Sequence, residues 1–346
     1  MSEGGAVENI PPHDFRVVIR TLGSQQTGLG HLRRCLALAR ALQHPSGFVD
    51  FWVEDIEAVS MVQNTGFAAC LVDQETLPEP GVADMLVVDG YHYDEQFINK
   101  ARDRVPLVLA IEDLPDRFLP AHIILNSGTQ AKQPTQSYPS DTQFLLGADY
   151  ALLDSAFSES PSREYPTEVH RVLITVGGSD PRNLTPRLMQ WVRRSYPKVS
   201  QDVVVGPFFS NQTKIEEVAH GLGSVKLWPN PGNMRRVMCT ADLAVAGAGH
   251  TLFQLAACAT PTVAIAIFAN QLMHVKALAQ IGAVEWAARW NDNDLGDRIS
   301  TVAARFSGPA ARSSLGRTAR EKVDGRGAQR VAAVAVDRLR KEQAYD

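Results

Sequence analysis

Residues 241–271, ADLAVAGAGHTLFQLAACATPTVAIAIFANQ, decide the fold that we expect for this chain. The segment contains two apolar runs, Leu243 to Val245 and Thr262 to Ile267, and both are typical of buried strands. Between them, a Gly-Ala-Gly turn leads into the amphipathic segment Thr251 to Ala259, which ends at a Thr-Pro pair. The pattern predicts a strand, a turn, a helix and a second strand, the unit from which parallel sheets are built.

The turn of this unit, Gly247-Ala248-Gly249, lies where the first strand ends and the helix begins. Backbone N–H groups are unpaired at a helix N-terminus, and the helix dipole favours an anion such as phosphate there. A tight connection that binds nothing fits the same residues, because Gly-x-Gly alone is a weak signal. This stretch by itself therefore leaves both interpretations open.

Apolar runs and amphipathic segments alternate along the rest of the chain. The further expected strands are 15–22, 49–53, 68–72, 85–88, 107–111, 123–125, 172–176, 203–205 and 225–227. The further expected helices are 31–42, 56–64, 95–102, 184–194, 212–219, 234–239, 272–281, 295–306 and 328–342, and the glycines and serines of 307–316 precede a mixed-charge C-terminal tail. This alternation predicts an α/β protein with parallel, doubly covered sheets.

The length of 346 residues exceeds what one hydrophobic core usually supports, so we expect two domains. The segment 153–166, LDSAFSESPSREYP, interrupts the alternation with serine, proline and charge. We therefore place the interdomain connection there. The predicted division is a flexible N-terminal tail (1–14), an N-terminal Rossmann-like lobe on the catalytic side (15–155), a linker (156–170) and a C-terminal Rossmann-like lobe on the nucleotide side (171–346).

The formal net charge of −4 gives no electrostatic reason to expect nucleic acid or an anionic membrane as a partner. No apolar run is long enough to span a bilayer, and the polar start of the chain lacks the pattern of a signal peptide, so we expect a cytoplasmic protein. The four cysteines have no metal-ligand spacing, and no cluster of histidine, cysteine and carboxylate residues has it either. Neither a metal nor a cofactor is expected, and the oligomeric state stays open.

A partial repeat joins the two predicted lobes. Gly28-Leu29-Gly30-His31 and Gly247-Ala248-Gly249-His250 share the pattern Gly-x-Gly-His, and each lies between an apolar strand and an amphipathic helix. In such sheets ligands bind beyond the carboxyl ends of the strands, so we expect a ligand cleft between two Rossmann-like lobes. Four shared residues are few, so coincidence stays open as an explanation.

His31 is the strongest candidate for chemistry, since its ring can project from the end of the sheet as a general base or a hydrogen-bond donor. Arg34 lies three residues later, on the same helix face, where it could bind a phosphate or carboxylate. A helix-capping role for His31 and an unliganded Arg34 are the structural alternatives. Asp89 and Tyr91 follow the strand 85–88 and are placed with His31 in the catalytic group.

Three polar segments complete the predicted substrate site. Gly177, Gly178 and Ser179 follow a buried strand and offer backbone N–H groups to a diphosphate, while Asp180 is in position to cap the next helix. The remaining candidates are expected to bind phosphate, ribose or sugar hydroxyls, and they are Gly30, Gly247, Gly249, His250, Thr251, Gln254, Asn270 and Gln271. For Asn270 and Gln271 a helix-capping role is the simpler interpretation.

Taken together, several segments in the right order resemble the UDP-sugar hydrolases of the pseudaminic acid pathway. Those enzymes have a GT-B-like fold and are related to the lipid II N-acetylglucosaminyltransferase. The segments that carry the resemblance are GLGHLRRCLALA (28–39), VVDGY (87–91), IEDL (111–114), LGADYALL (146–153), TVGGSD (175–180) and residues 241–271. They cover most of the chain, which makes the resemblance more specific than any single motif.

The resemblance implies an α/β, GT-B-like fold and hydrolysis of a UDP-linked 2,4-diacetamido-2,4,6-trideoxyhexose, in which water attacks the anomeric carbon with inversion and UDP leaves. It places the catalytic histidine at His31 and the phosphate and uridine contacts at Gly177, Gly178 and residues 247–254. A nucleoside diphosphate is already a good leaving group, so the residues need only orient water and stabilise the departing charge.

The chain departs from the family pattern at four positions. Gln254 stands where the family usually has a glutamate that accepts hydrogen bonds from ribose, and a glutamine carbonyl can still accept them. His250 replaces a serine or threonine, Gly90 replaces a histidine, and Glu112 replaces an aspartate. Two other functions therefore stay open, namely a GT-B glycosyltransferase that uses a small-molecule acceptor and a non-catalytic nucleotide-sugar-binding protein.

Overall fold

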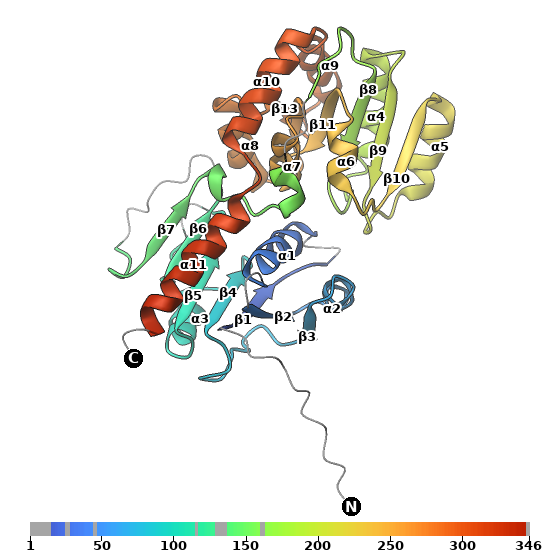
Figure 1. Ribbon diagram of the computed structural model, residues 1–346. Helices are drawn as coiled ribbons and strands as arrows, with labels where there is room; N and C mark the ends of the chain where they lie inside the picture. The colour runs from blue at the N-terminus through green and yellow to red at the C-terminus, as the bar shows by residue number, and fades with distance from the viewer. Residues whose placement is uncertain are drawn as a thin grey trace, which may run out of the picture.

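The computed structural model describes residues 15–24, 28–43, 47–114, 117–128, 137–159 and 163–343. The expected N-terminal tail, 1–14, lies outside the described residues, as does part of the expected linker. Two parallel sheets, each covered by helices on both faces, form two lobes that follow one another along the chain (Figure 1). Among the described helices, none combines the length and the apolar character that a membrane crossing requires.

The first sheet contains seven described strands in the order β3-β2-β1-β4-β5-β6-β7, all parallel. Its strands are β1 (Phe15–Thr21), β2 (Gly47–Val53), β3 (Ala68–Leu71), β4 (Met85–Asp89), β5 (Leu107–Ile111), β6 (Ile123–Asn126) and β7 (Gln143–Leu146). The helices between them are α1 (Gly30–Gln43), α2 (Ile56–Gln63) and α3 (Glu95–Arg102), and two short 3₁₀ turns follow at Ala148–Tyr150 and Ser155–Ser158.

The second sheet contains six described strands in the order β10-β9-β8-β11-β12-β13, again all parallel. Its strands are β8 (Arg171–Thr175), β9 (Ser200–Val205), β10 (Val225–Pro229), β11 (Leu243–Gly247), β12 (Thr262–Ala266) and β13 (Glu285–Arg289). The helices are α4 (Thr185–Ser195), α5 (Gln212–Leu222), α6 (Met234–Cys239), α7 (Thr251–Ala257), α8 (Gln271–Gln280), α9 (Leu295–Arg305), α10 (Pro309–Lys322) and α11 (Gly327–Gln343).

Central strands are apolar throughout because helices cover both of their faces. In β4, Met85 and Val87 belong to one buried cluster, and Leu86 and Val88 belong to the cluster on the opposite face. This alternation follows from the two-residue period of a strand. The predicted strand–turn–helix–strand unit at 241–271 is confirmed as β11, α7 and β12, with all five residues of each strand buried.

Each sheet has a point at which the strand order reverses its direction. In the first sheet, β1 lies between β2 and β4, and in the second, β8 lies between β9 and β11. The chain therefore leaves these neighbouring strands toward opposite sides, and their carboxyl ends are where open α/β sheets bind ligands. The predicted α/β architecture of two Rossmann-like lobes is confirmed.

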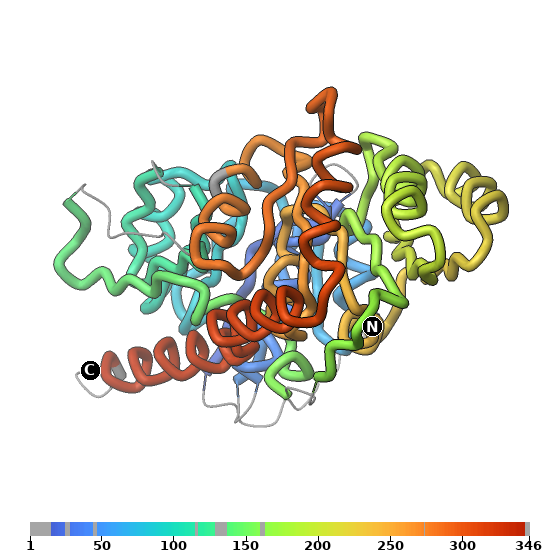
Figure 2. The backbone as a smooth tube through the Cα atoms, turned by 90° about the horizontal axis from the view of Figure 1, so that it is seen from above, coloured from blue at the N-terminus to red at the C-terminus, as the bar shows by residue number. Residues whose placement is uncertain are grey.

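Helix α11 corrects the expected boundary of the C-terminal lobe, which we had placed at residue 346. Figure 2 shows the last helix leaving the second lobe and running back over the first. Its residues Ala328, Val331, Ala332, Ala335 and Leu339 share one buried cluster with α1 and the first sheet. A helix with an apolar face packs wherever that face is best buried, and the sequence pattern gives no information about which sheet that is.

Three further elements differ from the predictions. Residues 309–322 form α10, where no helix was predicted, and Pro309 begins this helix, whose Leu315 and Ala319 are buried. The strands β7 and β13 were not predicted. β7 has only four residues, and β13 mixes charged and apolar residues, so neither has the apolar run on which strand prediction depends.

Candidate active site

His31 and Asp89 meet at the strand-order reversal of the first sheet. His31 is the second residue of α1, which follows β1, and Asp89 is the last residue of β4, which pairs with β1. The His31 Nδ1 atom lies 2.7 Å from Asp89 Oδ1. Asp89 is fully buried and His31 is 8% exposed, so the pair is sheltered from solvent. The sequence predicted both residues, and the fold places them in contact.

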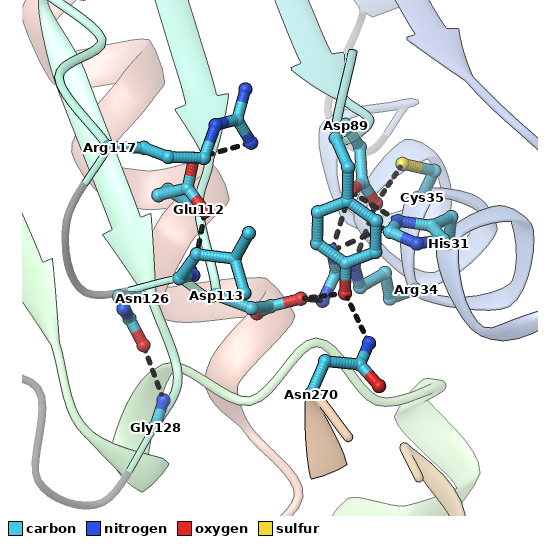
Figure 3. Close-up of polar contacts among 12 residues, drawn as sticks. His31, Arg34, Cys35, Asp89, Glu112, Asp113, Arg117, Asn126, Gly128 and Asn270 are labelled. Atoms are coloured by element: carbon cyan, nitrogen blue, oxygen red, sulfur yellow. Dashed lines mark hydrogen bonds and ion pairs between the residues drawn. The ribbon is translucent and has the colours of Figure 1, made fainter. Parts of the chain in front are cut away.

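Arg34 completes the surroundings of Asp89, as Figure 3 shows. Its Nε donates to Asp89 Oδ2 at 2.6 Å and its Nη2 donates to Asp89 Oδ1 at 2.5 Å. Its Nη1 donates to Asp113 Oδ2 at 2.7 Å, and the Cys35 thiol also donates to Asp89, at 3.3 Å. We expected Arg34 to bind a substrate anion, but all three of its guanidinium nitrogens contact carboxylates of the protein.

The charges around Asp89 fix its protonation state. Burial alone would raise the pKa of this carboxyl, but Arg34 and then His31 outweigh burial and hold the pKa well below its usual range. An ionised carboxylate can only accept hydrogen bonds, so the Nδ1 of His31 carries a proton and donates it. The 3.2 Å approach of Arg34 Nη2 to the same Nδ1 is therefore a close contact and not a second hydrogen bond. The other ring nitrogen, Nε2, is left as the acceptor.

Tyr91 lies against His31 and links the two lobes. The two rings pack edge to face with centroids 4.9 Å apart. The Tyr91 hydroxyl donates to Asp113 at 3.4 Å and accepts a hydrogen bond from Asn270 Nδ2 at 3.3 Å. Burial, and next the charge of Asp113, raise the pKa of Tyr91 to about 12, so its hydroxyl stays protonated at neutral pH. Asn270, from the second lobe, thus reaches the predicted catalytic group of the first.

The turn Gly177-Gly178 of the second lobe lies close to the first lobe. Gly177 has φ of +109°, which side chains rarely adopt, and a Cβ atom on Gly178 would lie 3.3 Å from the Leu29 side chain. The carboxylate of Asp180 accepts hydrogen bonds from the backbone N–H groups of Leu184 and Thr185, at 2.8 and 2.9 Å. The expected capping role of Asp180 is confirmed.

The second glycine turn, at the end of β11, leaves backbone donors unpaired. In the part of the chain that the structure describes, the N–H groups of Gly249, His250 and Thr251 have no backbone acceptor. Gln254 follows on α7 and is 9% exposed. Burial and then the charge of Arg34 lower the pKa of His250 to about 3, so its ring is neutral at physiological pH.

Gln271 has a structural role instead of the sugar contact that we had expected. Its Oε1 accepts hydrogen bonds from the backbone N–H groups of Ile267 and Phe268, at 2.9 and 3.3 Å. These bonds shape the loop after β12, and only its Nε2 remains as a possible donor to a ligand. Asn270, by contrast, makes no capping bond to α8 and turns toward Tyr91.

Neither Asp113 nor His274 is among the site residues that the sequence predicted. Asp113 follows β5, the strand next to β4, so its position beyond a strand end was the available signal. His274 lies in the first turn of α8, packs edge to face on Phe253 with centroids 4.7 Å apart, and has its pKa lowered by burial. In the described residues, no group of three or more histidine, cysteine or acidic side chains could hold a metal ion.

Glu112 forms a separate contact beside this network. One of its oxygens accepts a hydrogen bond from Leu114 N–H at 2.7 Å, and the other lies 2.8 Å from Arg117 Nη1 (Figure 3). Burial raises the pKa of Glu112 to about 7, although the Leu114 N–H and Arg117 oppose the shift. Glu112 is thus partly protonated at neutral pH and contacts neither His31 nor Asp89.

No protein-family model matches the chain. A protein from Helicobacter pylori, described as pseudaminic acid cytidylyltransferase and UDP-2,4-diacetamido-2,4,6-trideoxy-beta-L-altropyranose hydrolase, is 24% identical over 79% of this chain and 49% of its own length. An uncharacterized protein from Methanocaldococcus jannaschii is 24% identical over 75% of this chain and 56% of its own. The chain thus spans about half the length of these curated relatives.

Solved structures resemble the chain over nearly its whole length. MurG from Acinetobacter baumannii has a TM-score of 0.65 at 16% identity and matches 93% of this chain and 99% of its own. LpCGTa, solved in complex with UDP, has a TM-score of 0.63 at 12% identity and matches 94% of this chain. At such low identity these similarities confirm the predicted GT-B-like fold and establish nothing finer.

Proposed function

We propose that this protein is a nucleotide-sugar hydrolase in which His31 activates a water molecule that attacks the anomeric carbon, releasing a free sugar and a nucleoside diphosphate. The observation that carries the proposal is the His31–Asp89 contact at the strand-order reversal of the first sheet, 2.7 Å long and shielded from solvent. The aspartate holds the imidazole in the tautomer whose Nε2 accepts a proton.

Arg34 and Asp113 support this base without touching the nucleophile. Two bonds from Arg34 keep Asp89 ionised, and the bond from Arg34 to Asp113 fixes the guanidinium. Asp89 therefore remains a carboxylate while His31 takes up a proton, and the imidazolium that forms is stabilised by the adjacent negative charge. Arg34 and Asp113 are therefore positioning residues in this proposal.

The second lobe is proposed to hold the nucleotide. Its glycine turns end β8 and β11, the two strands at which the second sheet reverses its order. The unpaired N–H groups of Gly249, His250 and Thr251 suit the diphosphate, and Gln254 suits the ribose hydroxyls. The neutral ring of His250 leaves this position without a fixed positive charge, so backbone dipoles supply the stabilisation of the leaving group.

Two observations favour water as the nucleophile. The Tyr91–Asn270 hydrogen bond joins the lobes beside His31, with Tyr91 against the imidazole ring, and a nucleophile as small as water needs the least room beside these side chains. The Helicobacter pylori relative is, by its description, in part a hydrolase of a UDP-linked diacetamido-trideoxyhexose. We accordingly propose UDP and a diacetamido-trideoxy-like hexose as the substrate class.

Glycosyl transfer on the same residues is the second candidate, because several structural neighbours are glycosyltransferases by their descriptions. Incubation of the full chain with a panel of nucleotide sugars, with and without sugar or amine acceptors, separates the two. Acceptor-independent release of nucleoside diphosphate and free sugar supports hydrolysis, whereas acceptor-dependent release supports transfer. Tight binding without turnover would mean a non-catalytic binding protein.

The decisive variant is His31→Ala, with His220→Ala as its control because His220 is exposed on α5. We expect His31→Ala to lower kcat by on the order of 10²-fold or more with little change in nucleotide affinity, as general-base loss does. His220→Ala should behave as the wild type. Wild-type turnover in His31→Ala would remove His31 from the mechanism.

A further inference from the structure

Two free cysteines of the second lobe lie together at the ends of two helices. Cys239 is the last residue of α6 and is half-buried, and Cys258 directly follows α7 and is 2% exposed. Arg163 Nη1 donates to the backbone oxygens of both, at 3.1 Å for Cys239 and 3.4 Å for Cys258. One nitrogen thus holds the two cysteine backbones next to each other.

The two thiols also influence each other's protonation, and each is the largest cause of the other's pKa shift. The interaction with Cys258, together with the charges of Arg235, Arg163 and Arg320, lowers the pKa of Cys239, although burial opposes the shift. The same interaction, and next burial, raise the pKa of Cys258. At neutral pH Cys239 is therefore the more readily ionised of the two thiols, and Cys258 retains its proton.

The other two cysteines lack this combination. Burial, and next the charge of Asp89, raise the pKa of Cys35 well above the usual value. Cys70 is exposed on the edge strand β3, yet desolvation and the neighbouring Asp50 raise its pKa as well. By exposure alone, Cys70 would be the more reactive thiol. The thiolate is the reactive form of cysteine, however, so the lowered pKa of Cys239 makes Cys239 the more reactive of the two.

We propose that Cys239 and Cys258 form a reversible dithiol–disulfide site, in which Cys239 reacts first with a peroxide and Cys258 then closes the disulfide. The Cys239 thiolate attacks one oxygen of the peroxide and becomes a sulfenic acid, while the other oxygen leaves as water after taking a proton. The sulfur of Cys258 then displaces the hydroxyl from Cys239, and the proton of Cys258 leaves with that hydroxyl as a second water. Two thiols and one hydrogen peroxide thus give one disulfide and two waters.

Closing the disulfide acts at the ends of α6 and α7, which carry the two cysteines. A disulfide bond is about 2.05 Å long, which is shorter than any contact between two thiols, so the sulfurs have to approach each other. The N–H of Cys258 donates to the backbone oxygen of Gln254 at 3.1 Å, and the Cys258 oxygen is bound to Arg163. Oxidation therefore acts on the C-terminal turn of the same short helix that carries Gln254.

The test treats the full chain with equimolar hydrogen peroxide and maps its peptides by mass spectrometry without reduction. We expect a peptide pair that joins Cys239 to Cys258 and the loss of two titratable thiols, both reversed by dithiothreitol. In Cys258→Ser the reaction should stop at a Cys239 sulfenic acid that dimedone traps, and the matched control Cys70→Ser should form the same disulfide as the wild type. Absence of the Cys239–Cys258 link in the oxidised wild type would overturn the proposal.

Two further measurements do not depend on catalytic activity. Iodoacetamide at pH 7 should modify Cys239 about tenfold faster than Cys70, since thiolate fraction governs alkylation. Faster modification of Cys70 would contradict the assignment. Amide hydrogen exchange in residues 247–258 should change on oxidation of the wild type and not of Cys239→Ser, and equal exchange in oxidised and reduced wild type would refute the effect on α7.

Discussion

Replacement of Asp89 by asparagine tests how the candidate base is held. The carboxylate of Asp89 accepts hydrogen bonds from His31 Nδ1 at 2.7 Å and from Arg34 Nε and Nη2 at 2.6 and 2.5 Å. An asparagine has one acceptor and one donor group at these positions. If the asparagine oxygen faces Arg34, its NH₂ group faces His31 and donates a hydrogen bond to Nδ1. The imidazole then carries its proton on Nε2, and a protonated Nε2 cannot accept a proton from water.

The alternative orientation of the asparagine is also unfavourable. With the oxygen toward His31, the NH₂ group faces the Arg34 guanidinium, and two donors oppose each other in a buried site. Loss of the base in its active tautomer costs on the order of 10²- to 10⁴-fold in kcat, or about 3 to 5 kcal/mol of transition-state stabilisation. We expect a loss in stability of about 1–3 kcal/mol, less than a broken buried pair usually costs, because Arg34 keeps Asp113.

The assay is nucleoside diphosphate release under saturating substrate, with circular dichroism and thermal unfolding to confirm that the variant folds. Asp113→Asn is the matched control, because Asp113 contacts Arg34 and Tyr91 but makes no hydrogen bond to His31. It should lower kcat by less than about tenfold. A kcat of Asp89→Asn within threefold of the wild type, or an equal loss in both variants, would refute the reasoning about the tautomer.

Three other predictions concern the second lobe and the core. Gln254→Ala should raise KM for the nucleotide sugar, while Gln254→Glu, which keeps an acceptor, should largely preserve it, and an unchanged KM in Gln254→Ala would move the ribose site elsewhere. The pKa of His250 is about 3 in the folded protein and about 6.5 in the unfolded chain. Below pH 6.5 the unfolded chain therefore binds a proton that the folded protein does not, so the stability that is fully present above pH 6.5 is lost as the pH falls toward 3. Denaturant unfolding of His250→Gln should therefore show an acid dependence smaller by about 2 kcal/mol between pH 7 and pH 5, and an identical dependence would argue against a half-buried neutral ring. Leu339→Ala, on α11, should lower the free energy of unfolding by about 2–4 kcal/mol, because Leu339 is 2% exposed in the core of the first sheet, and a change below 0.5 kcal/mol would mean that α11 does not belong to that core.

Much of the fold could be predicted because strand and helix periods are local properties. The unit at 241–271 and the placement of Asp89 at a strand end both follow from residues that are neighbours in the chain. Helix α11 shows the limit, since its apolar face predicted burial but not against which sheet. That choice depends on contacts between residues far apart in the sequence.

In the candidate site too, local sequence patterns predicted individual residues, but not the contacts between residues far apart in the chain. His31 was predicted from its place after a glycine turn, and its contact with Asp89 followed only when the strand order put β1 beside β4. Arg34 was assigned to a substrate anion because sequence gives no sign that two carboxylates of the protein already surround it. The role of Gln271 likewise depends on the three-dimensional structure, since its side-chain oxygen accepts hydrogen bonds from backbone N–H groups of its own loop.

Hydrolysis in water enriched with ¹⁸O tests the central claim most directly, namely that the residues around His31 direct a water molecule to the anomeric carbon of a nucleotide sugar. The wild type, given a UDP-linked diacetamido-trideoxyhexose without acceptor, should release a sugar with ¹⁸O at its anomeric hydroxyl and inverted configuration by NMR, together with unlabelled UDP. His31→Ala should release neither product at a comparable rate. Label in the phosphate of UDP, or no release until an acceptor is added, would contradict the account.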